Sequence, residues 1–281
     1  FHGFIPVPQL ITEPALGHIG VMLAPVFIKP NKIQEEGKYI PPDITAGFVG
    51  YTANKTWGFG AARMASLPKY HLRYRVGAFH GDANMDFYME LTTVGEQQFE
   101  FNFKMTGAFI SVLREINNMD LFAGIDYFFA HNDVKPRFDA ANLPEFVNEK
   151  DLESNLSMLG VDVQYDKRDN VFTPNTGWYI QSAYRFNASW ICSDYDFGKF
   201  NIAVFRFFQT TPKWVSGFRL ESTFLTGDAP FYMKPFIDLR GVPMARYQGD
   251  QIYMVETEQR YDFTPRWSAL LIGCLGKAPT D

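Results

Sequence analysis

The sequence has little of what metal and redox sites require. Its 2 cysteines, Cys192 and Cys274, lie far apart and lack metal-ligand spacing. A disulfide between them has no support in the sequence, which favours two unrelated residues. The 5 histidines form no His-x-x-x-His pair. We therefore expect no metal and no cofactor.

Long apolar runs and basic clusters are also missing. No run of about 18 apolar residues occurs, which excludes a transmembrane helix by length. That criterion does not exclude a barrel, whose strands need only about 10 alternating residues. The formal net charge of -5, without basic clusters, argues against nucleic acid as a partner. No signal peptide follows Phe1, as expected of a mature or trimmed chain.

Aromatic residues are abundant, with 28 Phe and 14 Tyr, and apolar and polar residues alternate along the chain. The clearest case has an aromatic face and a polar face, made by Phe99, Phe101, Phe103 and Phe109 and by Glu100, Asn102 and Lys104. We expect the aromatic face to contact lipid and the polar face to line the lumen. A register slip would put Lys104 into hydrocarbon at a cost of ~2–4 kcal/mol.

The alternation and its turn residues predict about twelve strands, a number typical of barrels of this length. The expected spans are 17–29, 44–53, 56–66, 70–88, 98–114, 121–132, 156–166, 177–188, 199–210, 215–227, 252–263 and 266–276. Short connections are expected at 54–55, 117–120 and 211–213, and long polar ones at 30–43, 135–154 and 230–251. This asymmetry is that of an outer-membrane barrel.

A soluble β-sandwich or lipocalin-like barrel would also alternate. Two features favour the membrane: several strands exceed the usual ~5–6 residues, and aromatic residues gather near strand ends as in interfacial girdles. These aromatic residues are Trp178, Trp190, Tyr195, Phe197, Trp214, Tyr261 and Trp267. The sequence thus predicts an all-β, transmembrane antiparallel β-barrel as a single domain over residues 1–281.

Two segments carry more specific patterns. The first is a turn, in which Pro174 presets one backbone angle and Gly177 allows a positive one. An ordinary polar turn would not explain its whole string, Asp166, Arg168, Asp169, Pro174 and Gly177. The second is the Gly- and Pro-punctuated loop 238–250, whose notable residues are Arg240, Gly241, Arg246 and Tyr247.

Both segments resemble motifs of the bacterial surface-antigen superfamily, the BamA/TamA-type outer-membrane barrels, in a short form without periplasmic POTRA domains. The turn is similar to the family's periplasmic turn, and the loop to its sixth loop. The resemblance implies that the loop folds back into the barrel, where its Arg meets acidic residues. Here these would be Arg240 and either Glu256 or Glu258, of which Glu258 fits best. Such an Arg–carboxylate pair is charge-assisted and geometrically defined.

The chain also departs from that family. Leu239 and Val242 stand where Val and an aromatic residue are usual, and Cys274 stands where the last strand often has Asp. The chain stops after about twelve strands, whereas family barrels have about sixteen. We therefore expect missing C-terminal strands or a partner chain at the edge 266–276. The alternative is a smaller closed barrel, in which 266–276 pairs with 17–29.

By resemblance, the protein would insert or translocate protein, or move lipid, at the bacterial outer membrane. Its partners would be outer-membrane lipid and other outer-membrane or periplasmic proteins. The alternative is a passive or structural barrel subunit of a larger complex, with the loop as a plug. A membrane lipase is the third hypothesis, but sets such as Ser189, His131 and Asp194 lack a nucleophile elbow. We expect no enzymatic activity.

Overall fold

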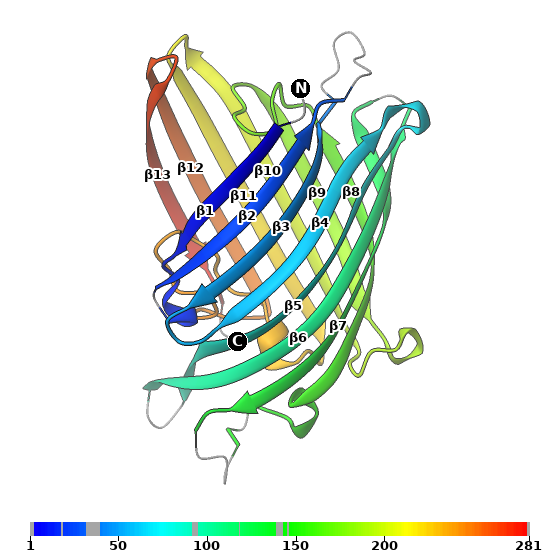
Figure 1. Cartoon of the computed structure of the whole chain (residues 1–281), viewed down its shortest axis with the longest axis vertical. Coiled ribbons are helices and arrows are strands. Elements are labelled where there is room, and N and C mark those ends of the chain that lie inside the picture. Colours follow the sequence, from blue (N-terminus) through cyan, green and yellow to red (C-terminus); the bar gives the residue numbers. More distant parts are fainter. Residues whose placement is uncertain are drawn as a thin grey trace.

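The chain folds into one antiparallel sheet of 13 strands that follow one another in sequence order (Figure 1). The computed structural model describes residues 3–17, 19–31, 40–91, 95–117, 119–138, 143–144 and 146–279. Within these ranges no helix has the length and apolar character needed to cross a membrane. The predicted all-β antiparallel fold is confirmed.

The strands are β1 (Gly3–Ile11), β2 (Gly20–Lys29), β3 (Asp43–Thr52), β4 (Trp57–Leu67), β5 (Leu72–Leu91), β6 (Gly95–Ile116), β7 (Leu121–Pro136), β8 (Glu153–Asp166), β9 (Gly177–Asn187), β10 (Phe197–Thr211), β11 (Trp214–Gly227), β12 (Gln251–Thr264) and β13 (Trp267–Lys277). Five short 3-10 helices are η1 (Pro14–Leu16), η2 (Pro68–Tyr70), η3 (Glu149–Asp151), η4 (Ser189–Ile191) and η5 (Phe231–Met233).

All of the expected strands are present, with shifts of a few residues at their ends. The predicted number of strands is one too low, because the sequence analysis expects no strand before residue 17 and the structure has β1 there. Its prolines, Pro6 and Pro8, explain the error, since proline is rare in strands except at sheet edges. β1 is such an edge strand.

Each strand places alternate residues on two faces. We call the inner face the one that contacts the loop 228–250, whose Phe231 packs against Phe101 and Phe103 of β6. Through the strand register, Asp162 of β8 lies on this inner face and is 0% exposed. Its neighbour Val161 lies on the outer face and is 53% exposed. An apolar outer face and a polar inner face are typical of a transmembrane barrel.

The lipid-facing assignment for residues 99–109 is wrong. The aromatic residues lie on the inner face and contact the loop side, and Phe101 and Phe103 are 0% and 4% exposed. The reason is that the loop covers this face: β6 has 22 residues, whereas a strand crosses a bilayer in about 9–11, so part of β6 extends past the bilayer and packs on Phe231. Beyond the crossing, the apolar face packs on the loop and the polar face, with Lys104 exposed, meets water.

The predicted aromatic girdle is divided between the two ends of the strands, with Trp190, 71% exposed, in η4 at the end opposite to the other tryptophans. Trp178, Trp214 and Trp267 are 40%, 39% and 75% exposed, and they begin β9, β11 and β13 at the same rim. Tyr195 and Phe197 do not belong to it, because both are buried in a cluster with Leu156. That part of the girdle prediction is corrected.

Connections alternate between two rims of the sheet. One rim, called the short-turn rim, carries the brief connections at 68–71, 117–120, 212–213 and 265–266. The other, called the loop rim, carries the connections 137–152, 188–196 and 228–250. The predicted asymmetry is only partial, because the long connection from β2 to β3 leaves from the short-turn rim, and the short connection 53–56, predicted at 54–55, lies on the loop rim. Most of the connection from β2 to β3, residues 32–39, lies outside the described residues.

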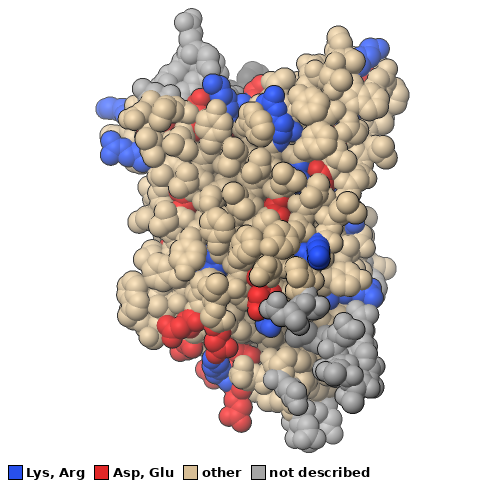
Figure 2. Space-filling model, turned by 180° about the vertical axis from the view of Figure 1, so that it is seen from behind, with Lys and Arg blue, Asp and Glu red and all other residues tan. Residues whose placement is uncertain are grey.

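β1 and β13 are the two edges of the sheet; in Figure 1 they are the dark blue and the red strand. In the described residues, β13 pairs with β12 and has no strand on its other side. The alternative of a smaller barrel closed by pairing of 266–276 with 17–29 is therefore not the arrangement in this structure. Seen from behind in Figure 2, most charged atoms lie towards the top and bottom of the wall.

Candidate functional site

The loop 228–250 crosses the loop rim from β11 and reaches the opposite wall. Its Phe231 is 2% exposed and stacks among aromatic side chains, with ring centroids 5.1 Å from Phe87 and 4.9 Å from Phe101. At its other end, the Met244 backbone N–H donates to Glu13 Oε1 at 3.0 Å, beside η1. The loop thus joins both halves of the sheet at this rim.

The loop is internally ordered. Ile237 N–H donates to Tyr247 O at 2.9 Å and Gly249 N–H donates to Pro235 O at 3.0 Å. Ile237 and Leu239 are buried with Ile252 and Met254 of β12. Apolar contacts therefore fix the two arms of the loop on the sheet, and the residues between them form a tip.

Arg240 and Gly241 lie in that tip. Both are exposed, Gly241 has a positive φ of 83°, and Arg240 takes part in no ion pair or hydrogen bond among the described residues. Glu256 and Glu258 lie on the inner face of β12 and likewise have no partner within the described ranges. The expected ion pair between Arg240 and these carboxylates is therefore absent from this structure and stays a prediction.

Arg246 and Tyr247 occupy the return arm of the loop. The Arg246 guanidinium lies 5.5 Å from the ring centroid of Tyr88 on β5 and 5.6 Å from that of Tyr247, and Tyr247 is 48% exposed. Cation–π contacts of this kind stabilise exposed sites by about 0.5–1 kcal/mol. Arg246, rather than Arg240, is thus the loop arginine that contacts the opposite wall.

The turn motif forms a compact loop over residues 167–176. Arg168 donates twice to Asp166, Nε to Oδ1 at 2.8 Å and Nη2 to Oδ2 at 3.0 Å. Asp169 Oδ1 accepts the Asn175 and Thr176 backbone N–H groups at 2.9 and 3.2 Å. Side-chain acceptors therefore satisfy the backbone that no strand partner reaches.

Gly177 ends this turn with φ of 119°. A Cβ there would meet Lys167 O at 2.1 Å, so only glycine fits. The sequence correctly singled out Gly177 for a positive φ. Pro174 lies in the same turn, directly before Asn175 and Thr176, whose backbone N–H groups donate to Asp169.

A buried hydrogen-bond network that the sequence did not reveal ties three loop-rim segments together. Asp151 is 0% exposed, accepts the Tyr195 hydroxyl at 2.5 Å and accepts the Asn148 N–H at 3.0 Å. Ser154 and Tyr232 of η5 bond through their hydroxyls at 2.7 Å. Burial raises the pKa of Asp151 and of Tyr195, and raises the pKa of Tyr232 to about 12. The tyrosines therefore remain neutral donors at physiological pH.

The inner face of the central strands is cross-linked by charge. Arg185 donates to Asp126 with Nε–Oδ1 at 2.7 Å and Nη2–Oδ2 at 3.1 Å. Arg75 lies 3.1 Å from Asp162, which also accepts amide groups from β8 and β9. Bidentate pairs of this kind are strong and geometrically specific. No local sequence signal identified them, because their partners are 59 and 87 residues apart.

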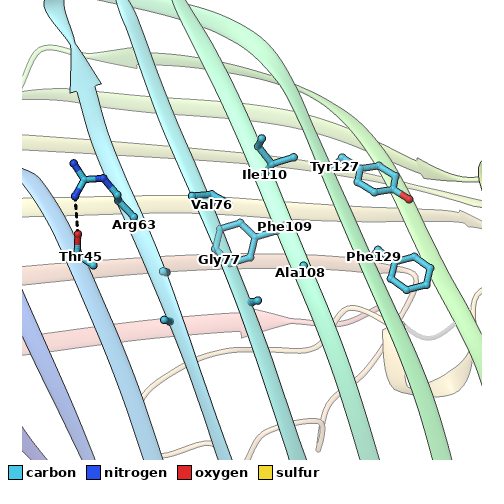
Figure 3. Close-up of a pocket in the computed structure, with 12 residues that line it drawn as sticks. Thr45, Arg63, Val76, Gly77, Ala108, Phe109, Ile110, Tyr127 and Phe129 are labelled. Carbon is cyan, nitrogen blue, oxygen red and sulfur yellow. Dashed lines mark hydrogen bonds between the residues drawn. The ribbon is translucent and has the colours of Figure 1, made fainter.

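The outer face carries a groove of about 530 Å³, seen in Figure 3. Its floor is a row of small residues in register, Ala61, Ala78 and Ala108, on β4, β5 and β6. Arg63 closes one side, with Nη1 donating to Thr45 Oγ1 at 2.8 Å and Nε to Tyr74 Oη at 2.9 Å. These bonds offset the cost of a cation on an apolar wall.

An antiparallel sheet with an apolar outer face, a charged inner face and a rim of tryptophan defines a transmembrane β-barrel of the outer membrane. The Omp85 superfamily domain matches residues 52–237, more than half of the chain. The chain belongs to the Omp85 superfamily. The match ends just before the tip that contains Arg240.

Solved structures agree on the fold. The chain is similar to BamA from Haemophilus ducreyi lacking POTRA domains 1-3, with a TM-score of 0.59 and 10% identity over 94% of this chain and 53% of that one. It is also similar to CdiB from Escherichia coli, with a TM-score of 0.64 and 9% identity over 96% of this chain and 51% of that one. The chain thus spans about half the length of these proteins. No curated protein matches the sequence.

Proposed function

We propose that this barrel inserts or translocates polypeptide at the outer membrane through a weak seam at the free edge of β1. Its relatives by fold, BamA and CdiB, are Omp85-type barrels, which act as insertion or translocation factors and work with lipid and other envelope proteins. The observation that carries the proposal is the pair of prolines in β1, Pro6 and Pro8.

The register tells which way these prolines face. Pro6 lies directly opposite Pro25 of β2. Opposed residues in an antiparallel pair alternate between hydrogen-bonded and non-hydrogen-bonded pairs, and two prolines cannot donate to each other. Pro6 and Pro25 are therefore a non-hydrogen-bonded pair. It follows that Pro6 and Pro8 direct their nitrogen atoms to the free edge of β1, whereas Pro25 directs its nitrogen towards β3.

The β2–β3 ladder supports this interpretation, because it keeps one register but lacks the pairs between Leu23 and Val26, where Pro25 lies. The backbone nitrogen atoms that point to the free edge of β1 belong to Phe4, Pro6, Pro8 and Leu10. Of these, only Phe4 and Leu10 carry an N–H group that can donate a hydrogen bond. Any strand that closes the barrel there loses two bonds of about 0.5–1.5 kcal/mol each. A seam of this kind opens more easily than the rest of the wall and can be taken over by an incoming strand.

The loop completes the proposal. Arg240 is exposed, and Glu256 and Glu258 on the inner face of β12 have no partner among the described residues. We assign these three groups to a second arrangement of the loop, in which the tip folds inward and the arginine meets one of the carboxylates. By the same proposal, the short-turn rim with the motif 166–177 faces the periplasm.

The test is to restore the missing donors. A Pro6→Val/Pro8→Val variant should strengthen the seam and lower the rate at which the reconstituted protein folds a substrate barrel into liposomes, or secretes a substrate. We expect a loss of about tenfold or more, since two bonds are gained. Pro25→Val is the matched control, because it restores a donor inside the sheet and leaves the β1 edge unchanged. Equal rates in all three proteins would refute the seam.

A passive or structural barrel is the second candidate, and the packing of Phe231 on Phe87 and Phe101 favours it, because the loop then acts as a plug. Planar-bilayer conductance separates the two. A plug predicts low conductance that rises when Phe231→Ala frees the loop, together with no substrate folding by the wild-type protein.

A further inference from the structure

One row of inner-face residues crosses six strands in register, from β5 to β10. Its members are Arg75, Ser111, Asp126, Gly160, Arg185 and Lys199. We call this row the basic belt. Three of its residues are cations and one is a carboxylate.

Gly160 makes the central contact of the belt. A Cβ at this position would lie 2.7 Å from both Arg185 Cγ and Asp126 Oδ1. Its absence lets Arg185 on β9 reach across β8 to Asp126 on β7, two strands away. This pair uses the only carboxylate of the belt, and Arg75 is bound to Asp162 of a neighbouring row.

Lys199 is the cation of the basic belt that has no acidic partner among the described residues. It lies beside Arg185 in the register, a like charge, and it forms no ion pair or hydrogen bond with any part of the chain that the structure describes. A partly buried ammonium group without a counter-charge is costly. Lys199 therefore supplies one uncompensated positive charge to the barrel interior.

This charge faces a cavity of about 350 Å³, which is within the size range of small-ligand sites. The polar part of its lining is the basic belt without Gly160, and the apolar part includes Phe128, Met158 and Met233. Met233 comes from η5, so the loop forms one wall. The Ser111 hydroxyl is buried and has no hydrogen-bond partner among the described residues.

We propose that this cavity binds a singly charged phosphate oxyanion, carried by a phospholipid headgroup or free in solution. Lys199 supplies the counter-charge, Ser111 supplies a hydroxyl donor, and Arg75 has guanidinium N–H groups beyond the one bound to Asp162. The apolar wall suits the glycerol and first methylenes of a lipid. One uncompensated charge matches a phosphodiester better than a doubly charged group.

This inference is independent of the seam at β1, because β10 lies far from that edge in the strand order. Variants of Lys199 leave Pro6 and Pro8 unchanged. Failure of one proposal therefore says nothing about the other.

The experiment measures binding to the purified protein in a zwitterionic detergent by calorimetry. The probes are dihexanoyl phosphatidylglycerol, inorganic phosphate near pH 6, and dihexanoyl phosphatidylcholine, which has the same acyl chains without net charge. Lys199→Met should weaken phosphate binding about tenfold or more, as expected for loss of a charge-assisted hydrogen bond. Lys199→Arg should keep most of it. Lys213→Met, on the exposed turn before β11, is the matched control and should bind as wild type does.

Lys199-dependent binding of phosphatidylglycerol, with none of phosphatidylcholine, supports a lipid source. Lys199-dependent binding of inorganic phosphate alone supports the free anion. Ser111→Ala is a second test, because it should weaken binding of the same probe without changing any charge. The proposal is overturned if neither anionic probe binds, or if both bind Lys199→Met and wild type equally.

Discussion

The first four strands and the central strands of this barrel are built differently on the inside. On the inner face of β1–β4, all within the described residues, there is no Asp, Glu, Lys or Arg, and the residues nearest the middle are Val26, Ala46, Phe48 and Ala62. The inner face of β5–β12 is charged, through Arg73, Arg75, Asp126, Asp162, Arg185, Lys199, Arg219, Glu221, Glu256 and Glu258.

The two regions are therefore held by different forces. In β7–β9, the Asp126–Arg185 pair spans three strands, so separating any of them also breaks a charge-assisted bond. In β1–β4, no ion pair crosses the inner face of the described residues; Arg63 of β4 bonds to Thr45 and Asp43 of β3 on the outer face, and the β2–β3 ladder is interrupted at Pro25. The inner-face ion pairs that oppose separation of the strands therefore lie in the central strands, away from the β1 edge. The region beside the proposed seam is the one built to yield.

The largest effect on the free energy of unfolding should come from removing the Asp126–Arg185 ion pair of the central strands. Asp126→Ala leaves Arg185 without its carboxylate, next to the like charge of Lys199. We expect a loss of about 3 kcal/mol in the free energy of unfolding, towards the low end for a buried pair because the Arg185 side chain is 32% exposed. Urea unfolding in lipid vesicles measures it.

The matched variant is Asp126→Leu/Arg185→Met, which removes both charges and should recover most of the stability. If the double variant were as unstable as Asp126→Ala, packing rather than charge would hold these strands.

A smaller effect on the free energy of unfolding should distinguish the outer from the inner face of β1–β4. Ala61 and Ala62 are neighbours on β4, with Ala61 on the outer face and Ala62 on the inner. Ala61→Lys puts an ammonium group into lipid and should cost about 2 kcal/mol, whereas Ala62→Lys should cost less than half of that. Unfolding free energies of both variants are compared with wild type. Equal costs would mean that the interior beside β1–β4 is as dry as the bilayer.

The smallest effect is a difference in hydrogen exchange between two regions of the wild-type protein. Backbone amides of β1 and β2 should exchange with deuterium about tenfold or more faster than those of β8 and β9, because no ion pair among the described residues joins β1 to β2, whereas Arg185 binds Asp126 across β8. Mass spectrometry of the reconstituted protein resolves these segments. Uniform protection across the sheet would remove the basis for the comparison.

Much of the fold follows from the sequence because period-two alternation and turn residues are local signals. They placed the strands from β2 to β13, and they placed Gly177 at a positive φ. β1 escaped because Pro6 and Pro8 argue against a strand unless its edge position is known. The face of Phe101 was misjudged for a similar reason, since alternation separates two faces but does not say which one the loop covers.

The candidate sites depended even more on long-range information. Arg185 and Asp126 come together only through the register of three strands, and Lys199 is conspicuous only after its neighbours have been paired off. The resemblance pointed to Arg240, but the structure brings Arg246 rather than Arg240 to the opposite wall. Which of two loop arginines makes contact depends on how Ile237 and Leu239 are buried, and no local pattern encodes that.

The length of β6 has a consequence for what the molecule presents to its surroundings. At about 3.3 Å per residue, 22 residues extend about 70 Å, roughly twice the path of a strand that only crosses the bilayer. With β5 and β7 paired on either side, the residues of β6 beyond the length needed for a crossing form a three-stranded extension at the loop rim. Phe87 and Phe101 of this extension pack against Phe231 of the loop, so a molecule that binds at the loop rim contacts strands held both by their ladder and by an aromatic cluster.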